Sequence, residues 1–157
     1  MNRFSLLLVF FMFNYLNSQD LKLYEKESFV FENDTLNYRI LKPLNYNPNK
    51  RYPVHLFLHG SGERGNDNSS QLTHGGKFFL KKENREKYNS WVIFPQCSKN
   101  DRWPSLSSDQ WNKIINNKIT KPNKSLGLVI KLMDEFIEKN KSQFDNENLK
   151  FSSKLKK

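Results

Sequence analysis

Residues 53–70 read PVHLFLHGSGERGNDNSS, and this stretch decides the fold. Residues 53–58 are apolar except for His55, and a short apolar run of this kind is typical of a strand buried on both faces of a sheet. The run ends at His59-Gly60, and a long polar loop with three glycines follows it. Residues 91–94 read WVIF and predict a second short buried strand, which Pro95 ends.

Helical and extended patterns surround these two strands. A helix is expected over residues 71–88, and the clearest helix over residues 125–141, where apolar residues recur at three- and four-residue steps. Strand, helix, strand, helix in this order favours parallel pairing with right-handed crossovers. Upstream, residues 21–31 and 36–41 predict an antiparallel hairpin with its turn at Glu32-Asn33-Asp34. The expected fold class is therefore α/β, with the hairpin at an edge of the sheet.

The two ends of the chain differ from this central part. Residues 1–18 combine a short basic start, an apolar run and small polar residues, which is typical of a secretory signal peptide. The apolar run is too short to span a bilayer comfortably. Residues 142–157 form a basic tail that we expect to be poorly ordered. We therefore expect a single domain at residues 19–141 of a secreted or periplasmic protein that meets a membrane only through its signal segment.

Composition narrows the classes of function. The chain has 157 residues, enough for one ordinary domain, and its single cysteine excludes a disulfide framework or a cysteine-rich zinc site. Three histidines leave little material for a metal centre, and no cofactor is predicted. The net charge is +10 at pH 7, but no nucleic-acid motif or basic helical stripe accompanies it, so no nucleic-acid partner is predicted. A non-catalytic secreted binding module for an anionic polymer is the alternative function.

The glycine loop has two chemical interpretations. Gly60, Gly62 and Gly65 match the GxGxxG spacing of a dinucleotide-binding turn. However, the loop-forming residues 66–70 separate the last glycine from the helix, and no acidic residue at a strand end follows at the right distance. The other interpretation is an oxyanion loop, in which a His-Gly turn exposes backbone N–H groups to the negative oxygen formed in acyl transfer. A tight turn without chemistry would use the same glycines.

The wider pattern favours the oxyanion loop. Residues 51–68, together with QLTHG at 71–75 and FPQC at 94–97, closely resemble secreted α/β-hydrolases. The nearest group is the bacterial phospholipase/carboxylesterase and predicted-peptidase branch, which is related to dienelactone hydrolases and feruloyl esterases. Residues 36–43 also resemble the leading hairpin of this family. The resemblance covers roughly residues 30–140 and implies the amino-terminal part of an α/β-hydrolase fold.

The resemblance also implies roles for individual residues. Gly60 resembles the turn glycine of the family, and the backbone N–H of Ser61 resembles its first oxyanion donor. Two charged loop residues would brace the site, and two residues after the next strand would lie at the mouth of the pocket. The expected loop residues are Gly60, Ser61, Gly62, Glu63 and Arg64, and the possible pocket rim is formed by Gln96 and Trp103.

The catalytic residues of the family are not found. The family nucleophile sits in a GxSxG elbow, which an acid and finally a histidine follow along the chain. No GxSxG occurs in this sequence, and all three histidines precede residue 75. We therefore expect an N-terminal fragment of a serine hydrolase that has no Ser-Asp-His triad and is inactive alone. An ester- or peptide-type substrate is expected only if a downstream segment completes the domain.

Two further points depend on the structure. Cys97 with His59 or His74 could form a different nucleophile and base, although a small packing residue is the simpler interpretation of Cys97. The family topology would leave the strand at residues 54–58 with an unpaired edge, which favours aggregation or pairing with another chain. The sequence does not indicate the acyl group of a substrate or the oligomeric state.

Overall fold

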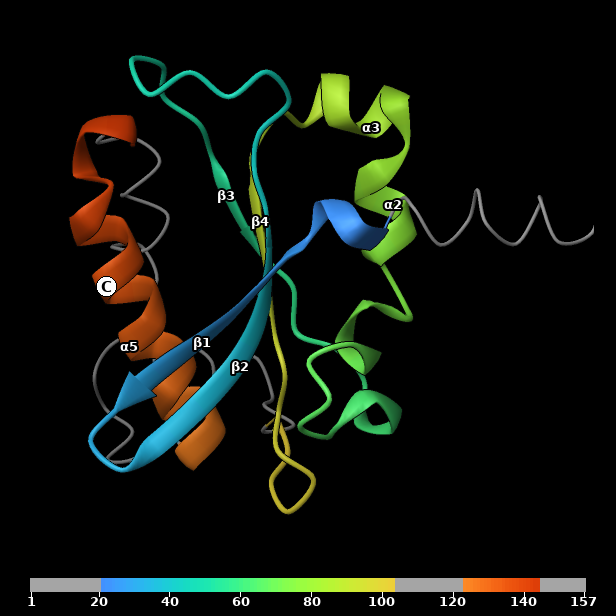
Figure 1. The fold of residues 1–157 in the computed structure, drawn as a ribbon, viewed down its shortest axis with the longest axis vertical. Helices are drawn as coiled ribbons and strands as arrows, with labels where there is room; N and C mark the ends of the chain where they lie inside the picture. Colours follow the sequence, from blue (N-terminus) through green and yellow to red (C-terminus); the bar gives the residue numbers. More distant parts are fainter. Residues whose placement is uncertain (1–20, 104–122, 145–157) are drawn as a thin grey trace, which may run out of the picture.

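A computed structural model describes residues 21–103 and 123–144 of the chain. This part contains a four-stranded sheet with helices on both faces (Figure 1). The expected signal segment at residues 1–18 and the region 104–122 lie outside the described residues, as does the chain beyond residue 144. No helix within the described ranges is long and apolar enough to cross a membrane.

The sheet is mixed and has the strand order β1-β2-β4-β3. β1 (Glu25–Phe31) and β2 (Asp34–Leu41) form an antiparallel hairpin with a tight turn, in which Glu32 has a φ of 54°. β2 also pairs antiparallel with β4 (Trp91–Pro95), and β4 pairs parallel with β3 (Val54–Leu56). The predicted hairpin at a sheet edge and the predicted parallel pair are both confirmed.

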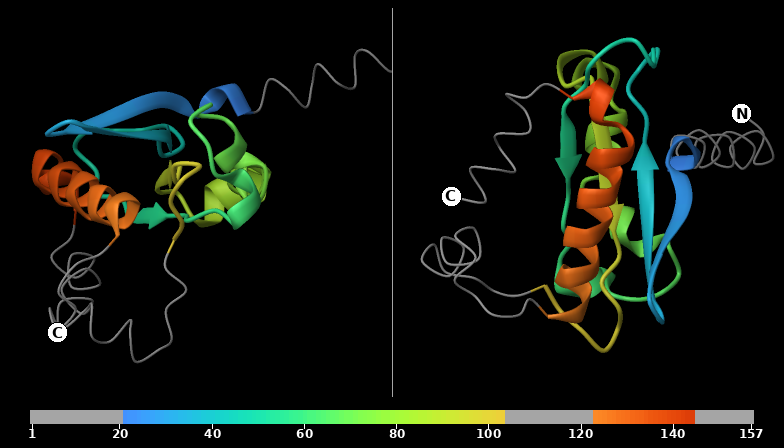
Figure 2. Two further views of the ribbon diagram at one scale, coloured as in Figure 1. Left: turned by 90° about the horizontal axis from the view of Figure 1, so that it is seen from below. Right: turned by 90° about the vertical axis from the view of Figure 1, so that its left-hand side faces the viewer.

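Two layers of helix enclose the sheet (Figure 2). The long helix α5 (Lys124–Lys139) covers one face, and the short helices α2 (Gly76–Leu80) and α3 (Lys82–Lys87) lie on the other. The remaining elements are 3₁₀ turns of three residues: η1 (Leu21–Leu23), η2 (Ser61–Glu63), η3 (Ser70–Leu72) and η4 (Lys141–Gln143).

Several predicted boundaries are wrong, each for a local reason. The helix predicted over residues 71–88 is split, because Lys81 takes an extended ψ of 132° between α2 and α3. The carbonyl of Lys81 accepts from the N–H groups of Asn84 and Arg85, which starts α3 afresh. The strand predicted from residue 21 begins only at Glu25, since the preceding residues form η1.

The long helix begins earlier and ends earlier than its predicted range of 125–141. Asn123 is its N-cap, and the side-chain oxygen of Asn123 accepts from the N–H of Leu126 at 3.2 Å. At the other end, the N–H of Asn140 donates to the carbonyl of Phe136. η4 then leads to Phe144, which is 5% exposed and packs in the core. The packed part of the chain therefore extends beyond the predicted domain boundary at residue 141.

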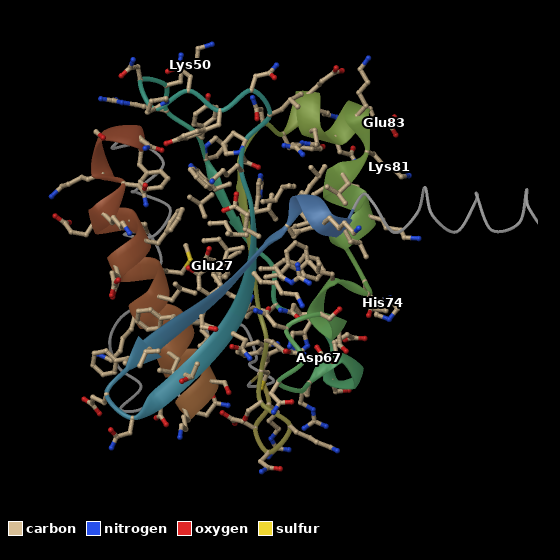
Figure 3. All side chains as sticks on the ribbon, in the orientation of Figure 1. Glu27, Lys50, Asp67, His74, Lys81 and Glu83 are labelled. Carbon is tan, nitrogen blue, oxygen red and sulfur yellow. The ribbon has the colours of Figure 1, made fainter. Side chains whose placement is uncertain are left out.

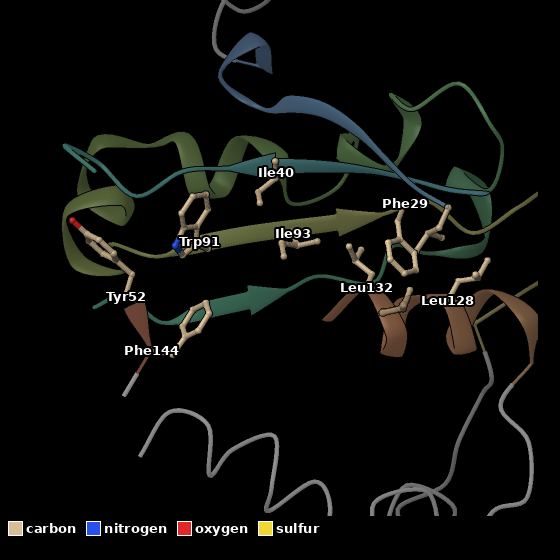
Figure 4. Packing of buried hydrophobic residues seen from close by; sticks show 10 residues of the cluster. Phe29, Ile40, Tyr52, Trp91, Ile93, Leu128, Leu132 and Phe144 are labelled. Atoms are coloured by element: carbon tan, nitrogen blue, oxygen red, sulfur yellow. The ribbon is translucent and has the colours of Figure 1, made fainter. Parts of the chain in front are cut away.

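Each face of the sheet carries its own apolar cluster. The cluster under α5 centres on the fully buried Ile93 of β4 (Figure 4). The cluster under α2 centres on Phe94, the next residue of β4, because successive side chains of a strand point to opposite faces. The α5 cluster consists of Phe29, Leu36, Ile40, Tyr52, Trp91, Ile93, Leu128, Val129, Leu132 and Phe144.

β3 and β4 differ in burial although both have apolar sequences. All five residues of β4 are buried, whereas Leu56 of β3 is 39% exposed. Val54 and Leu58 pack against the α5 cluster, and Phe57 packs against the α2 cluster. The strand predicted to be buried on both faces thus contacts both helical layers, but it lies at the edge of the sheet and is only half buried.

Gly75 is the position at which the entry into α2 requires glycine. Its φ is +104°, and a Cβ built there would lie 2.8 Å from Cζ of Phe57. We expect Gly75→Ala to lower the free energy of unfolding by about 3 kcal/mol, because it adds backbone strain and displaces a core ring. Gly62→Ala is the matched control, since nothing lies within 4 Å of its Cβ position. Denaturant unfolding of both variants tests this, and equal midpoints would contradict it.

Candidate functional site

The loop after β3 folds back across the carboxyl end of β4. The N–H of Phe57 still donates to the carbonyl of Ile93 at 2.9 Å, and the chain then leaves the sheet. At Gly60 the backbone is extended, with φ −75° and ψ 176°, and it enters η2. The N–H of Glu63 closes this turn by donating to the carbonyl of Gly60 at 3.3 Å.

The turn leaves two adjacent backbone donors open. Among the described residues, nothing accepts a hydrogen bond from the N–H of Ser61 or of Gly62. Gly60, Ser61 and Gly62 are all exposed. The turn therefore presents a pair of N–H groups to solvent at the carboxyl edge of the parallel strands, which is the place where open α/β sheets bind ligands.

His59 ties this loop to the neighbouring strand. Its ring Nδ1 lies 2.6 Å from the carbonyl oxygen of Gly60, and its Nε2 lies 2.9 Å from the backbone nitrogen of Cys97. A carbonyl only accepts and an N–H only donates, so the ring carries its proton on Nδ1 and accepts at Nε2. The side chain is fully buried. Both nitrogens of His59 are therefore engaged in holding the turn, and neither is free to act as a base.

Glu63 places a carboxylate against the same turn. Its Oε1 lies 3.2 Å from Nε2 of the exposed His74, while its buried Oε2 has no hydrogen-bond partner among the described residues. A Cβ on Gly60 would lie 3.0 Å from this Oε2. Figure 3 shows His74 on the side of the sheet opposite α5. Glu63 thus fits over Gly60 and leaves little room for a side chain there.

Gln96 joins the two ends of the loop from the end of β4. Its Nε2 donates to the carbonyl of Glu63 at 3.2 Å and to Oδ1 of Asp67 at 2.9 Å, and its Oε1 accepts from the N–H of Asn68 at 2.8 Å. The residue is 3% exposed. These contacts are those of a residue that positions the loop, and its predicted place at a pocket rim stays a prediction.

Asp67 fixes the second half of the loop. One oxygen accepts from the N–H groups of Ser69 and Ser70 at 2.7 and 2.8 Å, and the other accepts from the hydroxyl of Ser70. These hydrogen bonds, led by the two from Ser70, hold the pKa of Asp67 well below its usual value. Asn68 follows with a φ of 49°, and its carbonyl accepts from Nε of the buried Arg39 on β2. The loop is therefore anchored to β2 as well as to β4.

Arg64 and Asp101 connect the turn to the start of α5. The Arg64 guanidinium donates to the carbonyls of Ser61 and Asp101 at 2.9 and 3.0 Å. The Asp101 carboxylate accepts from the N–H of Ser125 at 2.8 Å and from the side chain of Asn123 at 2.9 Å. Burial acts to raise the pKa of Asp101, but these hydrogen bonds outweigh it and lower that pKa. Arg64 thus connects the turn to Asp101, and its predicted role in bracing a catalytic site stays a prediction.

The described residues hold no paired nucleophile and base. Cys97 is fully buried, and burial raises the pKa of its thiol, so the reactive thiolate is disfavoured. The backbone N–H of Cys97, and not its thiol, makes the hydrogen bond to Nε2 of His59. His55 packs its ring against Phe79 at a centroid distance of 5.8 Å. The interpretation of Cys97 as a packing residue therefore fits its surroundings.

Trp103 lies beside the turn on the α5 side. Its ring meets that of His59 edge-on, with centroids 5.4 Å apart, and it packs against the α5 cluster. Its Nε1 is buried and has no partner among the described residues. Within the described ranges, no group of three His, Cys, Asp or Glu side chains could hold a metal ion.

Sequence analysis named Glu63, Arg64 and Gln96 at this loop but missed the structural roles of His59 and Asp67. His59 is a structural brace, and neither its type nor its spacing distinguishes that role from catalysis. The D-x-x-S pattern at 67–70 is a recognisable turn and cap signature that could have identified Asp67. No sequence pattern indicates the hydrogen bonds of Gln96, because they join segments far apart in the sequence.

Among known proteins, the chain is similar to a solved structure of an esterase. No protein-family model matches the chain, and no curated protein matches it. A solved structure of a thermostable esterase shares 25% sequence identity with the chain, at a TM-score of 0.64. The match covers 81% of this chain and 33% of the esterase. The chain therefore spans about a third of the length of the esterase that it matches.

A second solved structure is a CE1 ferulic acid esterase from the anaerobic fungus Anaeromyces mucronatus, determined in the absence of substrate. It shares 14% identity at a TM-score of 0.45, and the match covers 74% of this chain and 42% of that one. A likeness at this level carries no argument of its own. The mixed sheet and the thermostable esterase together are compatible with part of an α/β-hydrolase fold and support an esterase-like group.

Proposed function

We propose that this chain supplies the oxyanion-binding part of a secreted ester-hydrolysing domain. The observation that carries the proposal is the pair of open N–H groups at Ser61 and Gly62, on a chain whose fold resembles part of an esterase. Two neighbouring N–H donors held by a rigid turn stabilise the alkoxide that forms when a nucleophile attacks an ester carbonyl. Glycine at position 60 leaves room for the Glu63 carboxylate, since a Cβ there would lie 3.0 Å from its Oε2.

The nucleophile and the proton-transfer groups are not part of this proposal. The sequence contains no GxSxG. Of the described histidines, His59 uses both ring nitrogens to hold the turn, His55 packs against Phe79, and the exposed His74 contacts Glu63. The chain alone would stabilise negative charge without a group that attacks or shuttles protons. A carboxylic ester is the expected substrate of a domain completed by further polypeptide, and a peptide is the less direct choice because the similar structure is an esterase.

A hydrolysis assay tests this function. The purified chain should give no turnover of p-nitrophenyl acetate above a buffer blank. A chimera in which this chain replaces the matched third of the thermostable esterase should hydrolyse the same ester, because its loop then faces a complete set of catalytic groups. Turnover by the chain alone would contradict the proposal, and so would a folded chimera without any turnover.

A further inference from the structure

The two helical layers of the protein differ in charge. Residues 76–87 span α2 and α3, and they contain five basic residues and only two acidic ones. α5 contains three lysines and three acidic residues, so its charges balance. The two layers lie on opposite faces of the sheet (Figure 2). The face covered by α2 and α3 therefore carries an excess of positive charge that the α5 face lacks.

Most of the lysines in this layer have no acidic partner. Lys77, Lys81 and Lys87 are exposed, and none of them forms an ion pair with a described residue. Lys82 lies 3.9 Å from Oε1 of Glu86, which is a long distance for an ion pair. Figure 3 shows Lys81 on the side of the molecule that faces away from α5. The positive charge of this layer is therefore presented to solvent and is not neutralised within the fold.

Two exposed aromatic side chains lie next to these lysines. Phe78 follows Lys77 on α2 and is 48% exposed, although the next residue, Phe79, packs against the cluster under α2. Tyr88 follows Lys87 at the end of α3 and is 40% exposed, and the Lys87 ammonium lies 5.2 Å from the centroid of its ring. Aromatic rings beside lysines suit the interface of a lipid bilayer, where the rings are buried and the ammonium groups meet the headgroups.

A small hollow at the end of α3 adds another cationic group. Lys42, Arg85, Tyr88 and Asn89 are among the residues that line it. Lys42 is paired with Glu25 at 2.8 Å. Arg85 donates from Nη2 to the carbonyl of Lys42 at 2.9 Å, and it forms no ion pair with a described residue. Arg85 therefore supplies the uncompensated charge of the hollow.

We infer that the α2–α3 face of the folded domain binds the surface of an anionic phospholipid bilayer. The binding surface consists of basic and aromatic residues, namely Lys77, Phe78, Lys81, Arg85 and Tyr88. Charge complementarity selects this occupant, because each basic side chain near an anionic bilayer strengthens binding. The exposed aromatic rings favour a bilayer over a soluble polyanion, which offers no apolar interior to bury them. The inference does not rest on the proposed function.

Co-sedimentation with lipid vesicles tests the inference. The full-length chain is mixed with vesicles of phosphatidylcholine and phosphatidylglycerol in a three-to-one ratio, and in parallel with vesicles of phosphatidylcholine alone. We expect binding to the mixed vesicles and a partition coefficient about tenfold lower or less for the neutral ones. Raising the salt concentration from about 50 mM to about 500 mM should weaken binding to the mixed vesicles, because salt screens the attraction between exposed charges.

Two pairs of matched variants locate the contact. Lys77→Gln combined with Lys81→Gln should weaken binding to the mixed vesicles about tenfold. Its control is Lys131→Gln combined with Lys139→Gln, which removes the same charge from exposed positions on α5 and should change binding by less than about twofold.

The second pair tests the apolar contact. Phe78→Ala should weaken binding about threefold or more, because the ring no longer enters the bilayer interface. Its control is Ile130→Ala, which removes an apolar side chain that is 39% exposed on α5 and should leave binding unchanged. Far-UV circular dichroism checks that each variant keeps the secondary structure of the parent, and the lysine pair decides the location if Phe78→Ala does not.

Several results would overturn the inference. Absence of binding to the mixed vesicles would do so, as would equal weakening by the two double lysine variants, which would show that only the net charge matters. Binding through the apolar residues 4–13 would survive high salt and every variant, and it would overturn the inference too. A loss with Lys77→Gln and Lys81→Gln but none with a folded Phe78→Ala protein would indicate a surface for soluble polyanions and not for a bilayer.

Discussion

Phe94→Ala should largely unfold the protein. Phe94 is fully buried in the middle of the sheet, and its ring meets those of Tyr24, Phe57 and Phe79 at centroid distances of 5.4, 4.7 and 5.9 Å. Removing a buried Phe side chain costs about 3–5 kcal/mol. The free energy of unfolding of a native domain is only about 5–15 kcal/mol, so this loss is a large fraction of the stability.

Phe78→Ala is the matched control for this substitution. Phe78 lies one residue before Phe79 on α2 and is 48% exposed, so its removal should cost less than about 1 kcal/mol. Urea unfolding followed by far-UV circular dichroism measures both variants. A Phe94→Ala protein with a cooperative transition near that of the wild type would contradict the packing described here.

The parts of the fold that the sequence predicted are those that local patterns determine. The hairpin followed from alternation around the turn at Glu32-Asn33, and the parallel pair followed from two short apolar runs separated by helical sequence. The prediction of one continuous helix over residues 71–88 was wrong, because the few apolar residues on its buried face do not indicate where the helix is interrupted. Phe79 and Leu80 both pack against the cluster that contains Phe94, and the chain turns at Lys81 directly after them.

The position of the candidate site could be predicted from the sequence, but the hydrogen bonds that hold its loop in place could not. The His-Gly turn after an apolar strand marks the loop in the sequence. The residues that hydrogen-bond to the loop belong to distant elements: Arg39 lies on β2, Gln96 follows β4 and Asp101 precedes α5. No spacing rule connects such residues, because only the folded sheet brings them together.

The extent to which β3 is buried also could not be predicted from its local sequence pattern. Its apolar run predicts contacts on both faces, and the structure has them. Whether the outer edge is covered depends on a neighbouring strand, which the composition of β3 itself does not specify. The apolar sequence therefore predicts a strand inside the sheet, whereas β3 is an edge strand among the described strands.

Ser61→Pro in the esterase chimera tests the central claim most directly. Proline removes the backbone N–H of residue 61, and the extended backbone of Gly60, with ψ 176°, is the conformation that a following proline favours. The carbonyl of Ser61 is retained as the acceptor for Arg64. Ser61→Ala is the control, because it removes the hydroxyl and keeps the N–H.

The measurement is kcat for p-nitrophenyl acetate hydrolysis by the three chimeras. Loss of one oxyanion donor costs about 10²–10³-fold in kcat, so we expect a fall of that size for Ser61→Pro and a kcat within about threefold of the parent for Ser61→Ala. Equal rates for the proline and alanine chimeras would show that the N–H of Ser61 does not stabilise the developing alkoxide, and they would contradict the account.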